Sequence, residues 1–251
     1  VLGWRRGLFG RRRIVRWRWR IGGMVMAGIV FSGADHARVT HAVAEAEHGT
    51  DGEIVTIVTP RSDEYHDVAL HFAVAAMLLV PALLAAAPAL LVRKLALFGG
   101  GWDAGTDLAL LLVGVFVVQA IVFLVVRYGL AWRWLRIRIA PLSTRERRVR
   151  RRAIQFFKAG AEKRTRQRVG ILLFLSLDER IAEIVADEAI HSRVAPEIWG
   201  EAMAALVDRV RAGDAAGGMV AAVARIGAVL AEHFPKTADD VNELPDRLIE
   251  L

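Results

Sequence analysis

The chain has 251 residues, of which 55% are hydrophobic, and its 34 Lys and Arg against 27 Asp and Glu give a net charge of +7. It contains no cysteine, which excludes disulfides, thiol catalysis and cysteine-based zinc or iron–sulfur sites. Its mean hydropathy of +0.36 argues against general disorder and points towards a membrane.

The N-terminal segment is strongly basic. Its first 20 residues hold eight arginines and no acid, and residues 21–31 are apolar or small. This order resembles the basic and apolar parts of a signal peptide, and Met24 and Met26 are later candidate starts. Because a basic region later in the chain favours the cytoplasm, we expect residues 1–31 to be a poorly ordered arm or a short interfacial helix on anionic lipid.

A helix and a strand are expected next, over residues 32–62. Residues 35–48 are amphipathic, and Ser32 and Asp35 have the spacing of a capping box with Asp in place of Glu. Gly49 to Gly52 break the helix, and the β-branched residues of 53–58 predict a strand. This segment therefore begins an α/β domain.

Two long apolar runs follow. Residues 72–92 carry no charge, and residues 108–126 have Gln119 as their one strongly polar side chain. Each run is about 30 Å long as a helix, which matches the hydrocarbon core of a bilayer. A pair of helices buried in a soluble protein is the alternative. The length and closeness of the runs favour a transmembrane hairpin over residues 66–130.

The flanking charges predict the orientation of this hairpin. Residues 127–168 contain 15 Lys and Arg and two acids, whereas the linker 93–107 contains two of each sign. The positive-inside rule places the region after the second span in the cytoplasm. With two spans, both termini are then cytoplasmic and the linker is outside.

One arginine run stands close behind the second apolar segment. We expect it to bind lipid head groups. Nucleic acid is the competing ligand, but no RNA-binding aromatic motif or helix-turn-helix signature accompanies the run. Its members are Arg145, Arg147, Arg148, Arg150, Arg151 and Arg152.

The remainder of the α/β domain is expected at residues 144–235, followed by a tail at 236–251. Its predicted elements are a basic helix from Ser143 or Thr144 to about residue 166, strands at 169–175 and 180–186, and helices at 196–212 and 219–230. The strand at 169–175 is continuously apolar, as a strand covered on both faces is. Strands with helices on both faces make an α/β sandwich.

The order of these elements resembles a known family. The stretches that carry the resemblance are Thr-Asp-Gly-Glu-Ile-Val-Thr-Ile-Val at 50–58, the apolar strand at 169–176, the turn and strand at 178–187, and Arg-Ala-Gly-Asp at 211–214. Together they resemble the TPM domain, also called the TPM phosphatase domain. The resemblance implies a small α/β sandwich with a mostly four-stranded sheet and flanking helices.

Here a two-helix transmembrane hairpin interrupts that domain, as in the bacterial membrane subset of the family. The resemblance implies a protein of the bacterial inner (plasma) membrane. The apolar runs and their flanking charges predict that it is multi-pass and that its soluble domain is cytoplasmic. Family members are associated with weak acid-phosphatase activity, with photosystem repair and with respiratory or receptor assemblies. These associations differ so much that they constrain the fold more than the reaction.

The best polar cluster for chemistry is Asp187, Glu188 and His191, directly after a predicted strand. Carboxylates and an imidazole at a strand end can bind a divalent cation such as calcium or magnesium. The alternative is that the acids cap local structure and His191 is solvated. Asp178 and Glu179 lie at the other end of that strand, so they are not expected to join the site.

Two functions remain open, and with them whether the protein is an enzyme. The first is a membrane-anchored, non-enzymatic assembly, repair or quality-control factor that binds membrane-protein partners at the cytoplasmic face. The second is a weak divalent-metal-dependent phosphatase. The first is favoured, because the sequence contains no Asp-x-Asp motif, P-loop or Gly-x-Ser-x-Gly elbow. The lipid bilayer and a membrane protein are the expected partners, and nucleic acid is not.

Overall fold

The computed structural model describes residues 15–20, 30–87, 108–160, 169–195, 197–238 and 246–251. The chain divides into two compact units. The first combines Val1–Asp63 with Leu142–Leu251, and the second is Glu64–Pro141. The first is an α/β unit and the second is a helical hairpin, and each is described by itself.

The α/β unit is built on a five-stranded sheet with the order β1-β4-β3-β2-β5. Its strands are β1 (Val15–Arg20), β2 (Glu53–Thr59), β3 (Gly170–Ser176), β4 (Ile181–Ala186) and β5 (Ile249–Glu250). β2 and β3 are parallel, with Glu53 opposite Gly170, and β3 and β4 form an antiparallel hairpin. The predicted strands at 53–58 and 169–175 are therefore neighbours in one sheet.

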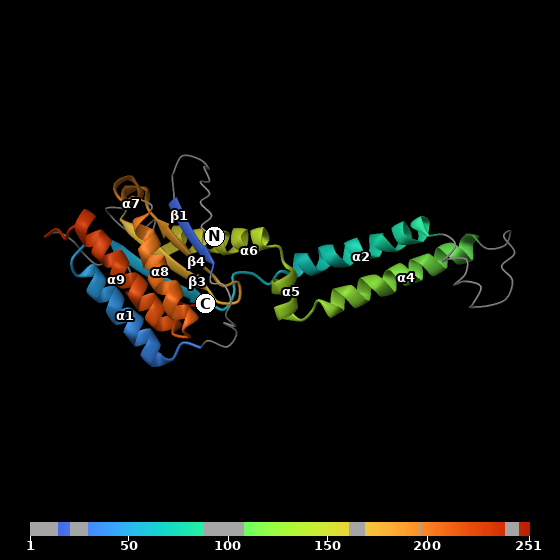
Figure 1. Cartoon of the computed structure of the whole chain (residues 1–251), viewed down its shortest axis with the longest axis horizontal. Coiled ribbons are helices and arrows are strands. Elements are labelled where there is room, and N and C mark those ends of the chain that lie inside the picture. Colours follow the sequence, from blue (N-terminus) through green and yellow to red (C-terminus); the bar gives the residue numbers. More distant parts are fainter. Residues whose placement is uncertain (1–14, 21–29, 88–107, 161–168, 196, 239–245) are drawn as a thin grey trace. The chain divides into compact units, whose positions relative to one another are not determined.

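Three helices cover one face of the sheet: α1 (Gly33–Glu47), α8 (Ile198–Arg211) and α9 (Ala215–His233) (Figure 1). The predicted capping box starts α1, since Ser32 accepts from the Asp35 amide and Asp35 accepts from the Ser32 amide. Trp199 and Met203 of α8, four residues apart, are fully buried in the core on this face. This helical spacing of apolar residues was visible in the sequence.

The opposite face is covered by α6 (Leu142–Gly160) (Figure 1). Val149, Ala153 and Phe157 recur every four residues and are buried with Leu172 and Phe174 of β3. The alternate residues of β3, such as Leu173, belong to the core on the first face. A strand that is covered on both faces has no polar side to present, which explains its unbroken apolar sequence. The predicted α/β sandwich is confirmed.

The second unit contains α2 (His66–Ala86), α4 (Leu108–Gly129) and the short α5 (Arg133–Ile139). Helices α2 and α4 pack against each other. Arg136 of α5 donates to the carbonyl oxygen of Glu64 at 3.1 Å and lies 2.6 Å from His66 Nδ1. This buried guanidinium therefore connects α5 to the start of α2.

The two chain ends differ from the expectation of an arm and a tail. Residues 15–20 form β1, which pairs antiparallel with β4 from Val15 opposite Ala186 to Arg20 opposite Ile181. Neither the poorly ordered arm nor the interfacial helix is therefore correct for these six residues. The sequence Val-Arg-Trp-Arg-Trp-Arg alternates apolar and basic residues with the period of a strand, a pattern that the high charge concealed. At the other end, β5 pairs in parallel with β2.

Two smaller differences concern helix starts. Helix α6 begins at Leu142, so neither Ser143 nor Thr144 is its N-cap. A short helix, α7 (Glu188–Arg193), directly follows β4 where no element was expected. The predicted end of the basic helix near residue 166 lies outside the described residues.

Candidate functional site

The predicted cation ligands lie at the junction of β4 and α7. Asp187 is buried, and its Oδ2 accepts from the backbone N–H of Gly170 at 3.1 Å. Glu188 is exposed in the first turn of α7, and His191 is half-buried. Across the described part of the chain, no three His, Asp or Glu side chains lie close enough together to hold a metal ion. Asp187, Glu188 and His191 are thus not gathered into a ready three-ligand site, and their role as ligands stays a prediction.

Asp187 is separated from a second buried acid, Glu53, by one strand of the sheet, β3. Glu53 lies opposite Gly170 in the sheet register, and Asp187 binds Gly170 from the β4 side. Glu47, Asp51, Glu53 and Asp187 are each no more than 8% exposed. We call these four residues the acidic edge, because they surround the beginning of β2 and β3. Of the four, only Asp187 was singled out from the sequence.

The acids of this edge bind groups of the fold itself. Asp51 accepts from the backbone N–H of Thr237 at 2.7 Å and from the Thr237 hydroxyl at 2.9 Å. Glu47 Oε1 accepts from the backbone N–H of Ile54 at 2.5 Å. These contacts join the end of α1, the start of β2 and the segment after α9, so the edge connects three separate parts of the chain.

Glu47 has the most unusual environment of the four. Burial raises the pKa of its carboxyl to about 8, and the Ile54 amide opposes this effect by favouring the charged form. The neighbouring acids Glu53 and Asp246 raise the pKa further. Glu47 therefore carries its proton in the folded protein at neutral pH.

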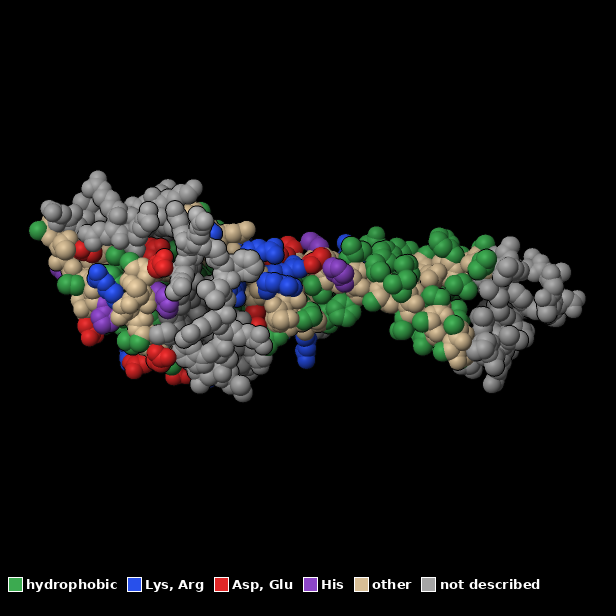
Figure 2. All heavy atoms as spheres, turned by 90° about the horizontal axis from the view of Figure 1, so that it is seen from above, with side chains coloured by type: hydrophobic (Ala, Val, Ile, Leu, Met, Phe, Trp, Pro, Cys, Tyr) green, Lys and Arg blue, Asp and Glu red, His purple; other side chains and the backbone are tan. Residues whose placement is uncertain are grey.

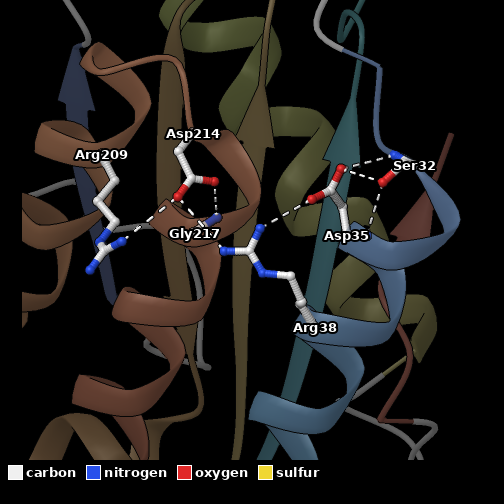
Figure 3. Close-up of polar contacts among 6 residues, drawn as sticks. All are labelled: Ser32, Asp35, Arg38, Arg209, Asp214 and Gly217. Carbon is white, nitrogen blue, oxygen red and sulfur yellow. Dashed lines mark hydrogen bonds and ion pairs between the residues drawn. The ribbon is translucent and has the colours of Figure 1, made fainter.

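A second polar network joins the ends of α1, α8 and α9 (Figure 3). Asp214 caps α9 by accepting from the Gly217 amide at 2.7 Å, and its other oxygen lies 3.7 Å from both Arg38 and Arg209. Arg38 also lies 3.3 Å from Asp35 of the capping box. A Cβ at position 217 would overlap the Asp214 carboxylate, so a larger residue there would displace this cap. These exposed ion pairs contribute little energy, and their role is to align three helix ends.

The six predicted lipid-binding arginines divide into two groups on α6. Arg148 is held by Asp63 at 2.9 Å, the guanidinium of Arg152 lies 4.8 Å from the centre of the Phe156 ring, and Arg145 is half-buried. Within the described residues, Arg147, Arg150 and Arg151 have no acidic partner. The lipid prediction is not tested by this arrangement, but Arg148 and Arg152 make contacts inside the unit.

The chain enters the inserted hairpin from a fixed point. The backbone N–H of Ser62 donates to Glu179 Oε1 at 2.9 Å, and the Ser62 and Ser176 hydroxyls lie 3.1 Å apart. Asp63, the next residue, makes the contact to Arg148. The last residues of the unit before the insertion are therefore tied both to the β3–β4 turn and to α6.

Apolar side chains point outwards along the hairpin helices (Figure 2). Three helices of the described chain are long and apolar enough to cross a membrane: His66–Ala86, Leu112–Gly129 and Ala215–His233. The first two lie in the hairpin and are 17% and 0% buried within the protein, whereas the third is α9 of the sandwich. The large exposed residues of the two hairpin helices include Leu78, Leu79, Leu83, Leu112, Phe116, Val117, Ile121 and Leu124.

One polar side chain connects the two hairpin helices. Pro81 lies inside α2 and has no N–H, so it cannot donate to the carbonyl of Met77 four residues earlier. Gln119 of α4 donates its side-chain N–H to that same Met77 oxygen at 3.4 Å. The proline thus leaves a carbonyl oxygen free to accept from Gln119 of the neighbouring helix.

Comparison with known proteins identifies part of this architecture. Residues 135–229 match the family model described as the TPM domain. The chain contains a TPM domain. The match covers most of α5, then α6, β3, β4, α7, α8 and most of α9, and the sheet adds β2 from before the hairpin.

The fold has a solved relative. The NMR structure of BA42 protein from the psychrophilic bacteria Bizionia argentinensis sp. nov. superposes with a TM-score of 0.51 at 15% identity, over 90% of this chain and 98% of that one. At this identity the likeness concerns the fold alone. No curated protein matches the chain significantly.

Proposed function

We propose that this protein is a membrane-anchored TPM-domain protein that binds a membrane-protein partner and acts as a non-enzymatic assembly, repair or quality-control factor. The observation that carries the anchoring is the outward-facing apolar surface of α2 and α4, which water covers at a high free-energy cost. Lipid removes that cost.

The orientation follows from charge. The 15 Lys and Arg of residues 127–168 favour a cytoplasmic position for the TPM domain, at the inner membrane of a bacterium. The insertion point supports a domain held near the bilayer, because Ser62 and Asp63 are fastened to the sandwich immediately before α2 begins. A domain held in this way meets other membrane proteins by diffusion in two dimensions.

The choice of binding over catalysis rests on the acidic edge. Three of its carboxylates accept hydrogen bonds from the fold itself, at Ile54, Thr237 and Gly170. Acids that are engaged in this way support a structural role. The bonds hold the sheet and its connections in one shape, as a binding surface requires.

Cysteine labelling in intact cells tests the topology, since the natural chain has no cysteine. We expect Gly100→Cys in the linker to react with a membrane-impermeant maleimide from outside. Gln155→Cys on the exposed side of α6 is the matched control and should react only after the cells are opened. Reaction of position 100 only in opened cells would contradict the proposed orientation.

The alternative, a weak divalent-metal-dependent phosphatase, is supported by the position of the buried acids Glu53 and Asp187 on the two sides of Gly170. Calorimetry with calcium, magnesium and manganese, combined with hydrolysis of a phosphate monoester, separates the two functions. We expect the wild type and the Asp187→Ala, Glu188→Ala double variant to behave alike. Saturable binding and hydrolysis that the double variant loses would replace the binding role with the enzymatic one.

A further inference from the structure

The exposed side of α6 carries a row of cations. Arg147, Arg150, Arg151 and Lys158 are spaced by three, four and eleven residues from the first, so they project on one side of the helix. We call these four residues the cationic stripe. At 1.5 Å per residue the stripe is about 16 Å long. Figure 2 shows Lys and Arg side chains gathered in the region of α6.

The stripe lies away from the side of α6 that packs on the sheet. That side presents Val149, Ala153 and Phe157 to the core. Arg147, Arg151 and Lys158 are exposed, and Arg150 is half-buried. No carboxylate among the described residues pairs with any of the four. Uncompensated cations in a row repel one another, so an anionic ligand stabilises them.

Two other arginines of α6 make contacts within the protein. Arg148 binds Asp63, and Arg152 lies over the Phe156 ring. A basic helix that served only solubility would not separate its cations in this way. The division leaves one side of the helix for the fold and another for a ligand outside the protein.

We infer that the cationic stripe binds the anionic head groups of the membrane in which the hairpin is anchored. This inference rests on the proposed function, because it requires a bilayer near α6. The chain itself provides the nearness, since α4 ends at Gly129 and α6 starts at Leu142. The distal part of the chain has the opposite character, because residues 178–251 contain 15 acids against seven basic residues. An anionic surface therefore attracts α6 and repels the far side of the TPM domain.

The test uses the full chain with Gln155→Cys as its single cysteine, labelled with an environment-sensitive fluorophore. The protein is reconstituted in phosphatidylcholine vesicles with an increasing fraction of phosphatidylglycerol. We expect the emission to shift to the blue and to saturate as phosphatidylglycerol increases. Each basic residue near an anionic surface strengthens the interaction about fivefold. The response should disappear at about 1 M salt, where the Debye length is about 3 Å.

Three variants isolate the stripe. Changing all four residues to Gln should lower the apparent affinity for phosphatidylglycerol by at least about tenfold. Changing the three arginines to Lys should keep the response, because head-group attraction needs charge and not the shape of guanidinium. Matched loss of four charges elsewhere, at Arg209, Arg211, Arg225 and Arg247, should leave it unchanged. The midpoint of urea unfolding checks that every variant is folded.

The outcomes are distinguishable. Failure of the wild type to float with neutral vesicles would contradict the anchoring and with it the proposed function. The stripe inference alone would be overturned if the protein floats but its emission does not change with phosphatidylglycerol. It would also be overturned if the Gln variant responds like the wild type. A labelled oligonucleotide is added to protein in neutral vesicles as a further arm. Binding of that oligonucleotide that depends on the stripe, without a lipid response, would assign the stripe to nucleic acid instead.

Discussion

Helices α9 and α4 are both long and apolar, but they have opposite surroundings. Both are long and apolar enough to cross a membrane, but 56% of the α9 window is buried in the protein and none of the α4 window is. α9 is covered by α1 and α8, whose small residues let the helices approach closely, as at Gly227 against Ala46. α4 has α2 on one side only. The comparison shows that hydropathy measures how much a helix needs an apolar environment. Packing determines whether the protein core or another apolar medium provides that environment.

Removing the hairpin is the strongest test of the difference between α9 and α4. We expect a variant with residues 64–141 replaced by a Gly/Ser linker to fold and to stay in solution without detergent, since α9 is covered by its own unit. Far-UV circular dichroism and flotation measure this. A cut that also removes the first half of α6 would expose the sheet face over Leu172 and Phe174, so it serves as the destabilised control. An unfolded 64–141 replacement would show that the hairpin is part of the core.

The next largest effect is expected when one Asp replaces an apolar residue in each of the two helices. Ile226→Asp in α9 buries an unpaired carboxylate, and we expect it to lower the free energy of unfolding of the TPM domain by more than about 4 kcal/mol. Val117→Asp in α4 should leave the domain folded and disfavour membrane insertion by about 2.5–3.5 kcal/mol. Proteolysis in urea and membrane retention report the two effects. Equal loss of domain stability in both variants would remove the distinction between the helices.

A buried acid inside the α/β unit gives an intermediate effect. Because the folded pKa of Glu47 is raised to about 8 from 4.5, the folded protein holds a proton that the unfolded chain releases. The resulting stability is fully present below pH 4.5 and is lost as the pH rises through about 8. Glu47→Gln keeps the acceptor for Ile54 and has no charge to bury. We expect it to stabilise the protein by on the order of 2 kcal/mol at pH 9 and little at pH 4.5.

Urea midpoints measured from pH 4.5 to pH 9 check this prediction. Glu45→Gln is the matched control, since Glu45 is exposed on the same helix and its variant should follow the wild type. Identical pH profiles for Glu47→Gln and the wild type would show that this carboxyl titrates alike in the folded and unfolded chain.

The smallest effect concerns the hairpin's own polar contact. Gln119→Leu removes the donor to the Met77 carbonyl, and we expect a cost of about 0.6 kcal/mol, a typical value for such bonds in membranes. In a Pro81→Ala background residue 81 regains an N–H that bonds Met77, so Gln119→Leu should then cost less. A double-mutant cycle in micelles measures the coupling. Equal costs in both backgrounds would separate Gln119 from the proline.

The sequence was informative where one local pattern sufficed. The capping box at Ser32, the apolar run that became β3 and the four-residue spacing of Trp199 and Met203 each depend on neighbours along the chain. Strand β1 was missed although its alternation was visible, because its partner β4 lies far along the sequence and pairing alone makes it a strand. The same distance hid β5, which has two residues.

The acidic edge was predictable only in part. Asp187 was chosen for its place after a strand, and the structure supports that place. Its expected companions Glu188 and His191 follow it in sequence, whereas the other acids of the edge, such as Glu53, come from distant segments, with β3 lying between β2 and β4. Glu47 gave no signal, since an acid near a helix end is ordinarily solvated. Thr237 gave no sequence signal either, because it and Asp51 are 186 residues apart in the chain.

The parallel pairing of β2 with β3 also sets the order of events during synthesis. About 110 residues separate the two strands, so at 5–20 residues per second the ribosome needs roughly 6–20 s to deliver the second after the first. Both apolar helices emerge within that interval, before the sheet has its central pair. During that time α1 and β2 have been synthesised but β3, which pairs with β2 along its whole length, has not. Completion of the TPM domain therefore reports that the hairpin has already been made.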